Sequence, residues 1–138
     1  LERLRSTDAQ QVFRAVFELN RLGERARVAI PDLLRVARAD ESELRQAAVN
    51  MLAVVAADDP RTKAMALEAL DDACPFVRRE ALQALIEVPG LSAADLARIK
   101  DRETDADEDV AEWSEIALRN ILASKETDQL DGAADVGD

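Results

Sequence analysis

Histidine and tyrosine are both absent from the 138 residues of this chain. Without imidazole groups, the chain lacks the usual general base of Ser/His and Cys/His nucleophilic pairs, and the commonest protein ligand of zinc and di-iron sites. Glycine is also scarce, and its four residues are isolated, so they form no glycine-rich loop for phosphate groups. These absences exclude most catalytic chemistry, and we expect no enzyme activity, no cofactor and no metal site.

Cysteine, aromatic residues and long apolar runs are scarce as well. Cys74 is the single cysteine, so no disulfide can form within the chain, and we interpret it as a small residue at a turn before Pro75. Aromatic residues make up 3% of the chain and hydrophobic residues 48%, a composition typical of closely packed helices. No apolar run approaches the roughly 20 residues of a membrane span, and no signal peptide is visible. We expect a piece of a longer or processed protein that does not enter a membrane, with a cytoplasmic location favoured.

The chain contains a repeat with a period of 33 residues. Three apolar columns recur in phase: Ala15, Ala48, Ala81 and Ser114; Leu19, Leu52, Leu85 and Leu118; and Leu22, Val55, Val88 and Ile121. Their spacing within each copy places the three columns on one face of a helix. A period in this range is typical of stacked helical arrays, in which no unit buries its apolar face alone. We therefore expect the leucine column to lie at the centre of the core.

Proline, glycine and helix-capping residues divide the chain into seven expected helices. Their approximate ranges are 8–22, 24–38, 41–56, 60–71, 75–88, 93–102 and 106–123, with a kink at Pro31 in the second. These helices form three antiparallel pairs preceded by a single one. Residues 124–138 have almost no apolar periodicity, and we expect a flexible acidic tail there. The expected division is a helical repeat domain over 1–123 and this tail over 124–138.

The repeated segments carry the residues of a known pattern. Asp72, Val77-Arg78, Ala81 and Ala84-Leu85 resemble the second-helix signature of HEAT repeats, most closely the short bacterial HEAT-like kind that also occurs in phycobilisome lyases. Two further segments are similar to the first-helix and second-helix halves of that pattern, namely Leu22 to Leu34 and Leu44 to Leu52. The resemblance covers about residues 8–123. It implies an all-α right-handed superhelix, or solenoid, of about 3.5 repeats.

The last repeat departs from the family pattern at two places. Val110-Ala111 stands where the family prefers an aliphatic residue followed by arginine, and Trp113-Ser114 stands where it prefers a variable residue followed by alanine. Terminal repeats tend to be atypical because they lack one neighbour. We expect Trp113 to cap the last repeat, with an exposed anchor for a partner as the alternative.

The acidic stretch from Asp101 to Glu112 has the spacing of a calcium loop, with acids at loop positions 1, 3, 5, 7, 9 and 12. However, Ala106 stands where the sharp turn needs glycine, and Glu108 stands at a position that normally points inward. The repeat register also makes this segment the end of one helix and the start of the next. We expect a solvated loop without metal, in which Asp105→Asn with Asp107→Asn leaves stability unchanged or slightly improved because crowded carboxylates repel one another.

The second helices of stacked repeats usually line one continuous face, and this face is the expected binding site. Opposite the apolar columns it carries Phe13 and Phe17, which either pack under Leu1 and Leu4 or face a repeat upstream of the chain, with a ligand contact as the third alternative. The polar residues expected to contact a partner there are Gln46, Asn50, Arg79, Gln83, Glu112 and Arg119. An ordinary solvated surface is the alternative.

Charge is distributed unevenly along the chain. Residues 1–58 are neutral, so the whole net charge of −11 lies in residues 59–138. This acidic end repels phosphate backbones, and we expect no nucleic-acid partner. It suits a protein with a basic surface, and the acids expected to attract it are Asp105, Asp107, Asp109, Glu112 and Glu115. The alternative is that the negative charge only keeps the protein soluble.

A second copy of the chain is one candidate for that basic surface. Its arginine-rich head contains Arg14, Arg21, Arg25 and Arg27. Such pairing would be head-to-tail and open-ended. We therefore expect a monomer or weak head-to-tail self-association.

These observations predict a non-catalytic protein–protein interaction or scaffolding module within a larger protein. The alternative, implied by the resemblance, is a component of a bilin-lyase-like enzyme that presents a chromophore to its acceptor protein. The missing histidine and tyrosine, which would help to hold a linear tetrapyrrole, favour the scaffold. A lyase should show visible absorbance when mixed with a bilin, whereas a scaffold should retain a protein partner in a pull-down.

Overall fold

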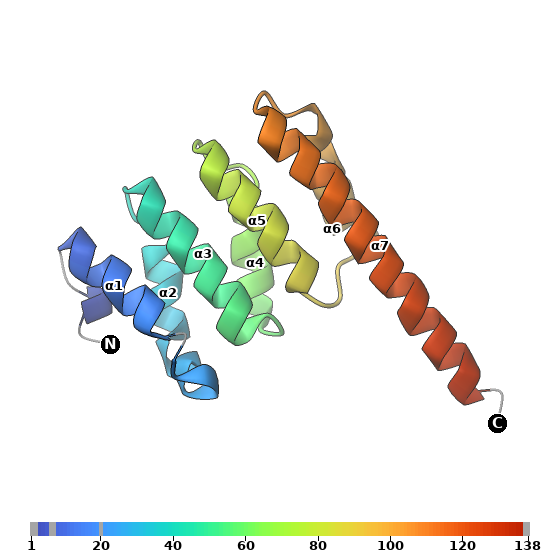
Figure 1. Ribbon diagram of the computed structural model, residues 1–138, viewed down its shortest axis with the longest axis horizontal. Coiled ribbons are helices and arrows are strands. Elements are labelled where there is room, and N and C mark those ends of the chain that lie inside the picture. Colours follow the sequence, from blue (N-terminus) through green and yellow to red (C-terminus); the bar gives the residue numbers. More distant parts are fainter. Residues whose placement is uncertain (1–2, 6–7, 20, 137–138) are drawn as a thin grey trace.

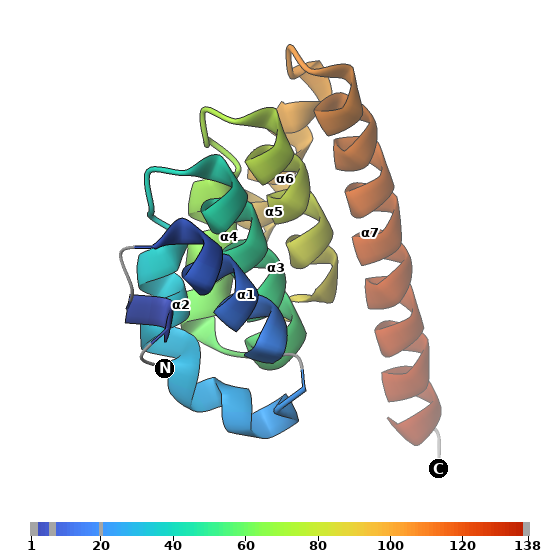
Figure 2. The same ribbon diagram turned by 60° about the vertical axis from the view of Figure 1, so that its left-hand side comes forward.

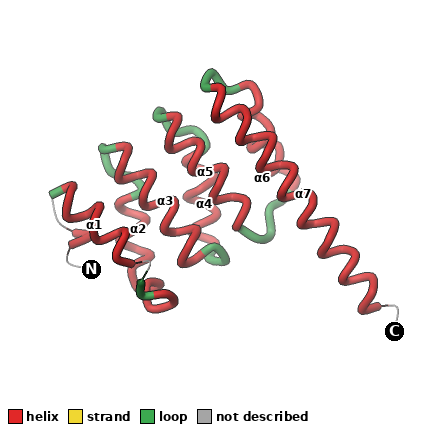
Figure 3. The backbone as a smooth tube through the Cα atoms, in the orientation of Figure 1, coloured by secondary structure: helices red, strands yellow, loops and turns green. Residues whose placement is uncertain are grey.

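The computed structural model describes residues 3–5, 8–19 and 21–136, and this part of the chain consists of helices and short connections without strands. The α-helices, in chain order, are α1 (Ala9–Leu19), α2 (Ile30–Val36), α3 (Ser42–Ala56), α4 (Pro60–Ala69), α5 (Pro75–Glu87), α6 (Ala93–Lys100) and α7 (Glu108–Val136) (Figure 1). Short 3-10 helices cover Arg3–Arg5, Gly23–Ala29 and Asp101–Thr104. Figure 3 shows how short the loops between the helices are. The expected all-α repeat architecture is confirmed.

The helices form two layers. α1, α3, α5 and α7 lie side by side in one layer, and α2, α4 and α6 form the second layer behind them (Figures 1 and 2). The principal packing within the first layer joins α1 to α3, α3 to α5 and α5 to α7. Each repeat therefore contributes one helix to each layer, as the 33-residue period predicts.

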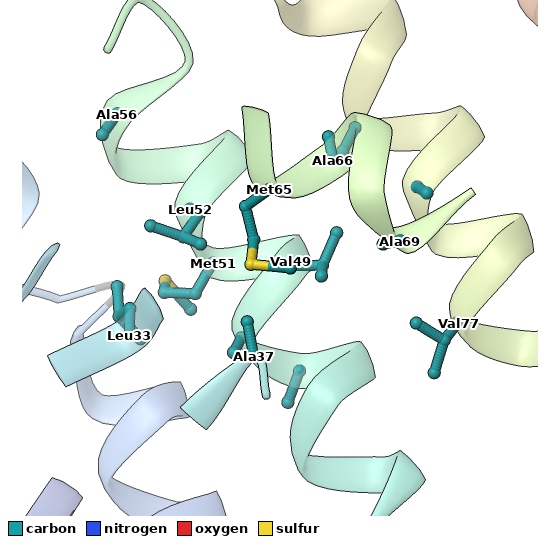
Figure 4. Packing of buried hydrophobic residues seen from close by; sticks show 14 of the residues in the cluster. Leu33, Ala37, Val49, Met51, Leu52, Ala56, Met65, Ala66, Ala69 and Val77 are labelled. Atoms are coloured by element: carbon teal, nitrogen blue, oxygen red, sulfur yellow. The ribbon is translucent and has the colours of Figure 1, made fainter. Parts of the chain in front are cut away.

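The core follows the apolar columns of the sequence. Ala48, Ala81, Leu52 and Leu85 are each 1% exposed or less, and Ala15 and Leu19 are also buried. Figure 4 shows how Leu33 of α2, Leu52 of α3 and Met65 of α4 fill the space between the layers. Many of the buried residues are alanines, whose small side chains allow dense packing between helices.

Three positions of the columns, Leu118, Leu22 and Val55, are less buried than expected. Leu118, which lies in α7, the last helix of the described chain, is only partly buried. Leu22 is 51% exposed, because α1 ends at Leu19 and Leu22 lies in the turn that follows. Val55 is half-buried. Ser114, the polar member of its column, is buried, and its hydroxyl donates a 2.6 Å hydrogen bond to the Ile99 carbonyl.

Pro31 begins a helix instead of kinking one. The expected helix over 24–38 is divided into the 3-10 helix Gly23–Ala29 and α2, with Pro31 in the first turn of α2. Proline is tolerated there because the first turn of a helix has no partner for the missing N–H. Pro60 and Pro75 occupy the same kind of position at the starts of α4 and α5.

The expectation that the last helix ends near residue 123 is wrong. α7 continues to Val136 and projects beyond the other helices (Figure 1). Elongation adds one backbone hydrogen bond per residue once a helix has started, and alanine, lysine and glutamate are good helix formers. The side-chain ammonium group of Lys125 also holds this segment to the body of the protein, since its Nζ donates to the Leu91 carbonyl at 2.8 Å. Whether residues 124–138 form a flexible unit stays a prediction.

A ladder of arginine–aspartate pairs joins consecutive repeats. Arg45 donates two hydrogen bonds to Asp72, at 2.8 and 2.9 Å, and Arg78 makes the same two bonds to Asp105, at 3.0 and 2.9 Å. The two pairs are 33 residues apart in the chain. Such bidentate pairs fix geometry as well as adding energy. The pattern does not continue, because Ala111 occupies the next arginine position.

Candidate interaction face

The exposed side of the first layer is the candidate site. We call it the groove face and define it by two columns of residues 33 apart on α1, α3, α5 and α7: Phe13, Gln46, Arg79 and Glu112; and Phe17, Asn50, Gln83 and Ile116. All eight side chains are exposed or half-buried, as their position opposite the leucine column predicts. Arg119 of α7 is exposed as well. The expected amide-bearing residues therefore share one continuous surface.

A hollow of about 330 Å³ lies between α1, α3 and α5 on the groove face. We call it the Glu80 pocket, and its lining consists of Phe13, Val16, Phe17, Glu43, Gln46, Ala47, Asn50, Met51 and Glu80. The rings of Phe13 and Phe17 meet edge to face, with their centroids 4.8 Å apart. The two phenylalanines thus form a wall of this pocket, and they remain 39% and 55% exposed. Leu4 is buried separately, and Leu1 lies outside the described residues.

A second hollow of about 400 Å³ lies one helix further along, between α3 and α5. Its lining shares Asn50 and Glu80 with the Glu80 pocket and adds Gln83 and Glu87. The two hollows are therefore neighbours, with Asn50 and Glu80 between them. Asn50 and Gln83, which both carry amides, are one 33-residue period apart on this surface.

Glu80 is the most unusual residue of the groove face. Its side chain is almost fully buried, with 7% of the residue exposed. Burial raises the pKa of the carboxyl group, while hydrogen bonds from the Asn50 and Gln46 amides and the charge of Arg79 partly oppose the rise. Glu80 was not among the residues that the sequence pattern singled out. The available signal was a carboxylate that stands one period after Ala47 and one period before Trp113, between two apolar residues of its column.

Arg79 does not pair with Glu80. Its guanidinium carbon lies 5.3 Å from the ring centroid of Phe76, the geometry of a cation–π contact. Its Nε atom is buried and has no hydrogen-bond partner in the described part of the chain. Phe76 is 55% exposed, so this pair forms a further aromatic and cationic feature next to the pocket.

The acidic end differs from the expectation at Asp105. The side chain of Asp105 is 3% exposed, and Arg78 and Arg102 both hold its carboxylate. Asp105 is therefore part of the ladder, and its buried carboxylate does not face a partner. The sequence did not reveal this, because Asp105 meets Arg78 only when the two repeats stack. Asp107 is half-buried and caps α7, accepting a 3.1 Å hydrogen bond from the Val110 N–H.

Three of the expected acids face solvent. Asp109, Glu112 and Glu115 are exposed on α7. The stretch from Asp101 to Glu112 is folded as a 3-10 helix, a short turn and the start of α7. Nowhere in the described residues do three or more metal-ligating side chains come together. This segment therefore offers surface charge rather than a coordination cage.

Cys74 and Trp113 are the remaining residues that the sequence singled out, and both pack within the fold. Cys74 is half-buried directly before α5, and its N–H donates a 2.9 Å hydrogen bond to Asp72. Trp113 is partly buried and packs against the core, which fits a role in covering the last repeat. Within the described residues, no helix has the length and apolar character needed to cross a membrane.

Among curated protein sequences, none matches the chain significantly. A solved structure that is similar is a designed armadillo repeat protein, YIII(Dq.V1)4CPAF, in complex with the peptide (KR)4. The TM-score is 0.67 and the sequence identity 16%, and the match covers 87% of this chain and 62% of that one. At this identity the likeness concerns the fold alone.

The sequence itself matches a family model. The model describes HEAT repeats and matches residues 30–119. This range contains α2 to α6 and most of the packed part of α7, including both arginine–aspartate pairs. It covers more than half of the chain, and the protein therefore belongs to the HEAT-repeat family.

Proposed function

We propose that this chain is a non-catalytic protein-interaction module that holds an extended, basic segment of a partner along the groove face. Repeats of this family typically mediate contacts between proteins through the surface formed by their stacked helices. The observation that carries the proposal is the pair of neighbouring hollows that share Asn50 and Glu80. A segment lying across the helices would meet both in succession.

The amides of the groove face suit an extended backbone. Each amide of Gln46, Asn50 and Gln83 both donates and accepts hydrogen bonds, as the peptide groups of an extended segment require. Neighbouring helices are about 8–10 Å apart, which equals two to three residues of extended chain. Asn50 and Gln83 stand in the same column of consecutive helices, so they would contact backbone groups at that interval.

The charge of this surface selects a basic segment. The acidic side chains along it outnumber the arginines: the acids are Glu41, Glu43, Glu80, Glu87, Asp109 and Glu112, and the arginines are Arg14, Arg79 and Arg119. The similar designed armadillo protein was solved with a peptide of alternating lysine and arginine, so this architecture accommodates such a segment. A negative groove raises the association rate of a basic partner, and salt reduces it.

Fluorescence anisotropy with a labelled (KR)4 peptide tests this function. We expect saturable binding that weakens between about 0.05 and 0.3 M salt. An Asp109→Asn, Glu112→Gln, Glu115→Gln variant should bind more weakly. A control that removes three exposed charges elsewhere, Asp40→Asn, Asp101→Asn and Glu126→Gln, should keep most of the affinity. Absence of binding, or equal losses in both variants, would contradict the proposal.

A second copy of the chain is the competing occupant of the acidic surface. Its arginine-rich head is partly engaged, because Arg27 forms an ion pair with Asp58 of its own chain. We therefore place self-association below peptide binding. Light scattering at high protein concentration and low salt separates the two, since head-to-tail pairing increases the mean mass with concentration.

A further inference from the structure

The Glu80 pocket contains a buried carboxylate without a cationic partner. Buried carboxylates in proteins are normally paired with a cation, because removing a charge from water is costly. In the described part of the chain, Glu80 takes part in no ion pair, and the neutral amides of Asn50 and Gln46 form hydrogen bonds with its carboxylate. Arg79, whose charge partly opposes the rise in the pKa of Glu80, lies over Phe76 instead of pairing with Glu80.

The charged and aromatic side chains that line the pocket all favour a cation. Its charged residues, Glu43 and Glu80, are both acidic, and no lysine or arginine lines it. The aromatic wall of Phe13 and Phe17 presents ring surfaces that attract cations. A volume of about 330 Å³ accommodates a long side chain but no folded element.

We propose that the Glu80 pocket receives one arginine side chain of the bound segment, with its guanidinium group paired to the Glu80 carboxylate and packed against Phe17. This inference rests on the function proposed above, and it names the side chain that gives the interaction its specificity. Its contacts come from α1, α3 and α5, so the pocket exists only where these three helices are stacked.

The geometry favours arginine over lysine. A carboxylate offers about four acceptor positions, and the amides of Asn50 and Gln46 use two of them. Two remain for the parallel N–H groups of a guanidinium, which bind a carboxylate in bidentate fashion. Arginine is also more weakly hydrated than lysine and stacks on aromatic faces, so it enters a half-apolar pocket at lower cost.

Peptide affinities measured with two sequences test the inference. The (KR)4 peptide should bind more tightly than an octalysine peptide of equal charge, and Glu80→Gln should remove this preference, with a loss of about 10- to 100-fold for (KR)4. Glu87→Gln is the matched control, because it removes an exposed charge from the adjacent hollow. It should weaken both peptides alike and keep the preference for arginine.

Phe17→Ala supplies an independent variant that leaves every charge in place. Phe17 is 55% exposed, so its loss should leave the fold intact, as circular dichroism can verify, while the preference for arginine falls. If (KR)4 binds but neither Glu80→Gln nor Phe17→Ala changes the arginine preference, the pocket inference is wrong and the proposed function stands. If (KR)4 does not bind the wild-type chain at all, both are wrong.

Discussion

Arg78 holds the carboxylate of Asp105 through two parallel hydrogen bonds of 3.0 and 2.9 Å, while its third nitrogen donates to the Asp72 carbonyl at 2.8 Å. Asp72 is in turn the residue that Arg45 holds one repeat earlier. The same arginine therefore closes the turn before its own helix and ties that turn to the next repeat. The stacking of α3, α5 and α7 depends on this connection as well as on apolar packing.

The first prediction concerns this pair. Asp105→Asn should destabilise the fold by about 1.5–3 kcal/mol, because it removes a charge-assisted bidentate contact from an almost fully buried position. This replaces the expectation from sequence that Asp105→Asn with Asp107→Asn is neutral or stabilising. Urea denaturation gives the free energy of unfolding. Asp101→Asn, which removes an exposed charge close by, should cost less than about 0.5 kcal/mol.

The second prediction is a loss of stability in acid. Burial by itself raises the pKa values of Asp72 and Asp105, but hydrogen bonds from Arg45 and Arg78 outweigh it and hold both below the ordinary 3.8. The unfolded chain therefore binds more protons, so this stabilisation is present above about pH 4 and is lost as pH falls through the folded values. Denaturation between about pH 6 and pH 2.5 measures it. An Asp72→Asn, Asp105→Asn double variant should show a shallower pH dependence, and an unchanged slope would contradict the linkage.

The third prediction has the opposite sign. Burial raises the pKa of Glu80 above its ordinary 4.5, so the folded state binds the extra proton. The corresponding stability is complete below about pH 4.5 and is lost as pH rises through the folded value. Glu80→Gln stays neutral, so its stability relative to wild type should increase from about pH 4 to pH 7. A difference that stays constant over this range would show that Glu80 does not titrate as proposed, and the exposed Glu87→Gln provides the comparison.

The fourth prediction tests the core. Leu52→Ala or Leu85→Ala should cost about 2–5 kcal/mol, because both side chains are almost fully buried and the gap between rigid helices cannot close. Leu118→Ala should cost clearly less, since the same column is only partly buried in the last repeat. Equal losses at all three positions would mean that α7 is covered in solution, for example by a further repeat.

The fifth prediction concerns the projecting end of α7. Amide hydrogen exchange should be fast beyond Lys125, the residue whose Nζ contacts the Leu91 carbonyl, because an exposed helix end gains little from packing. Deleting residues 127–138 should leave the melting temperature almost unchanged. Slow exchange throughout residues 126–136 would show that this end is stabilised as part of the domain.

The sequence by itself determined the architecture and the two faces of the second helices. A helix repeats its faces every 3.6 residues, so a 33-residue period that holds apolar residues in phase also holds the opposite face in phase. Leu52 and Leu85 are consequently in the core, and Gln46, Asn50 and Gln83 share the groove face. Proline positions and capping residues such as Asp59 and Ser92 fixed the helix starts for the same local reason.

Only the tertiary structure decided which residues meet between repeats. Nothing in the sequence distinguishes Asp105 from the neighbouring acidic residues. In the structure, the offset between stacked helices brings it to Arg78, 27 residues earlier in the chain. The surroundings of Glu80 also depend on the stacking of repeats. Glu80 is buried, and residues of α1 and α3, among them Phe13 and Phe17, line the same pocket. Periodicity specifies the direction in which a side chain points, whereas its partner depends on the displacement of one repeat against the next.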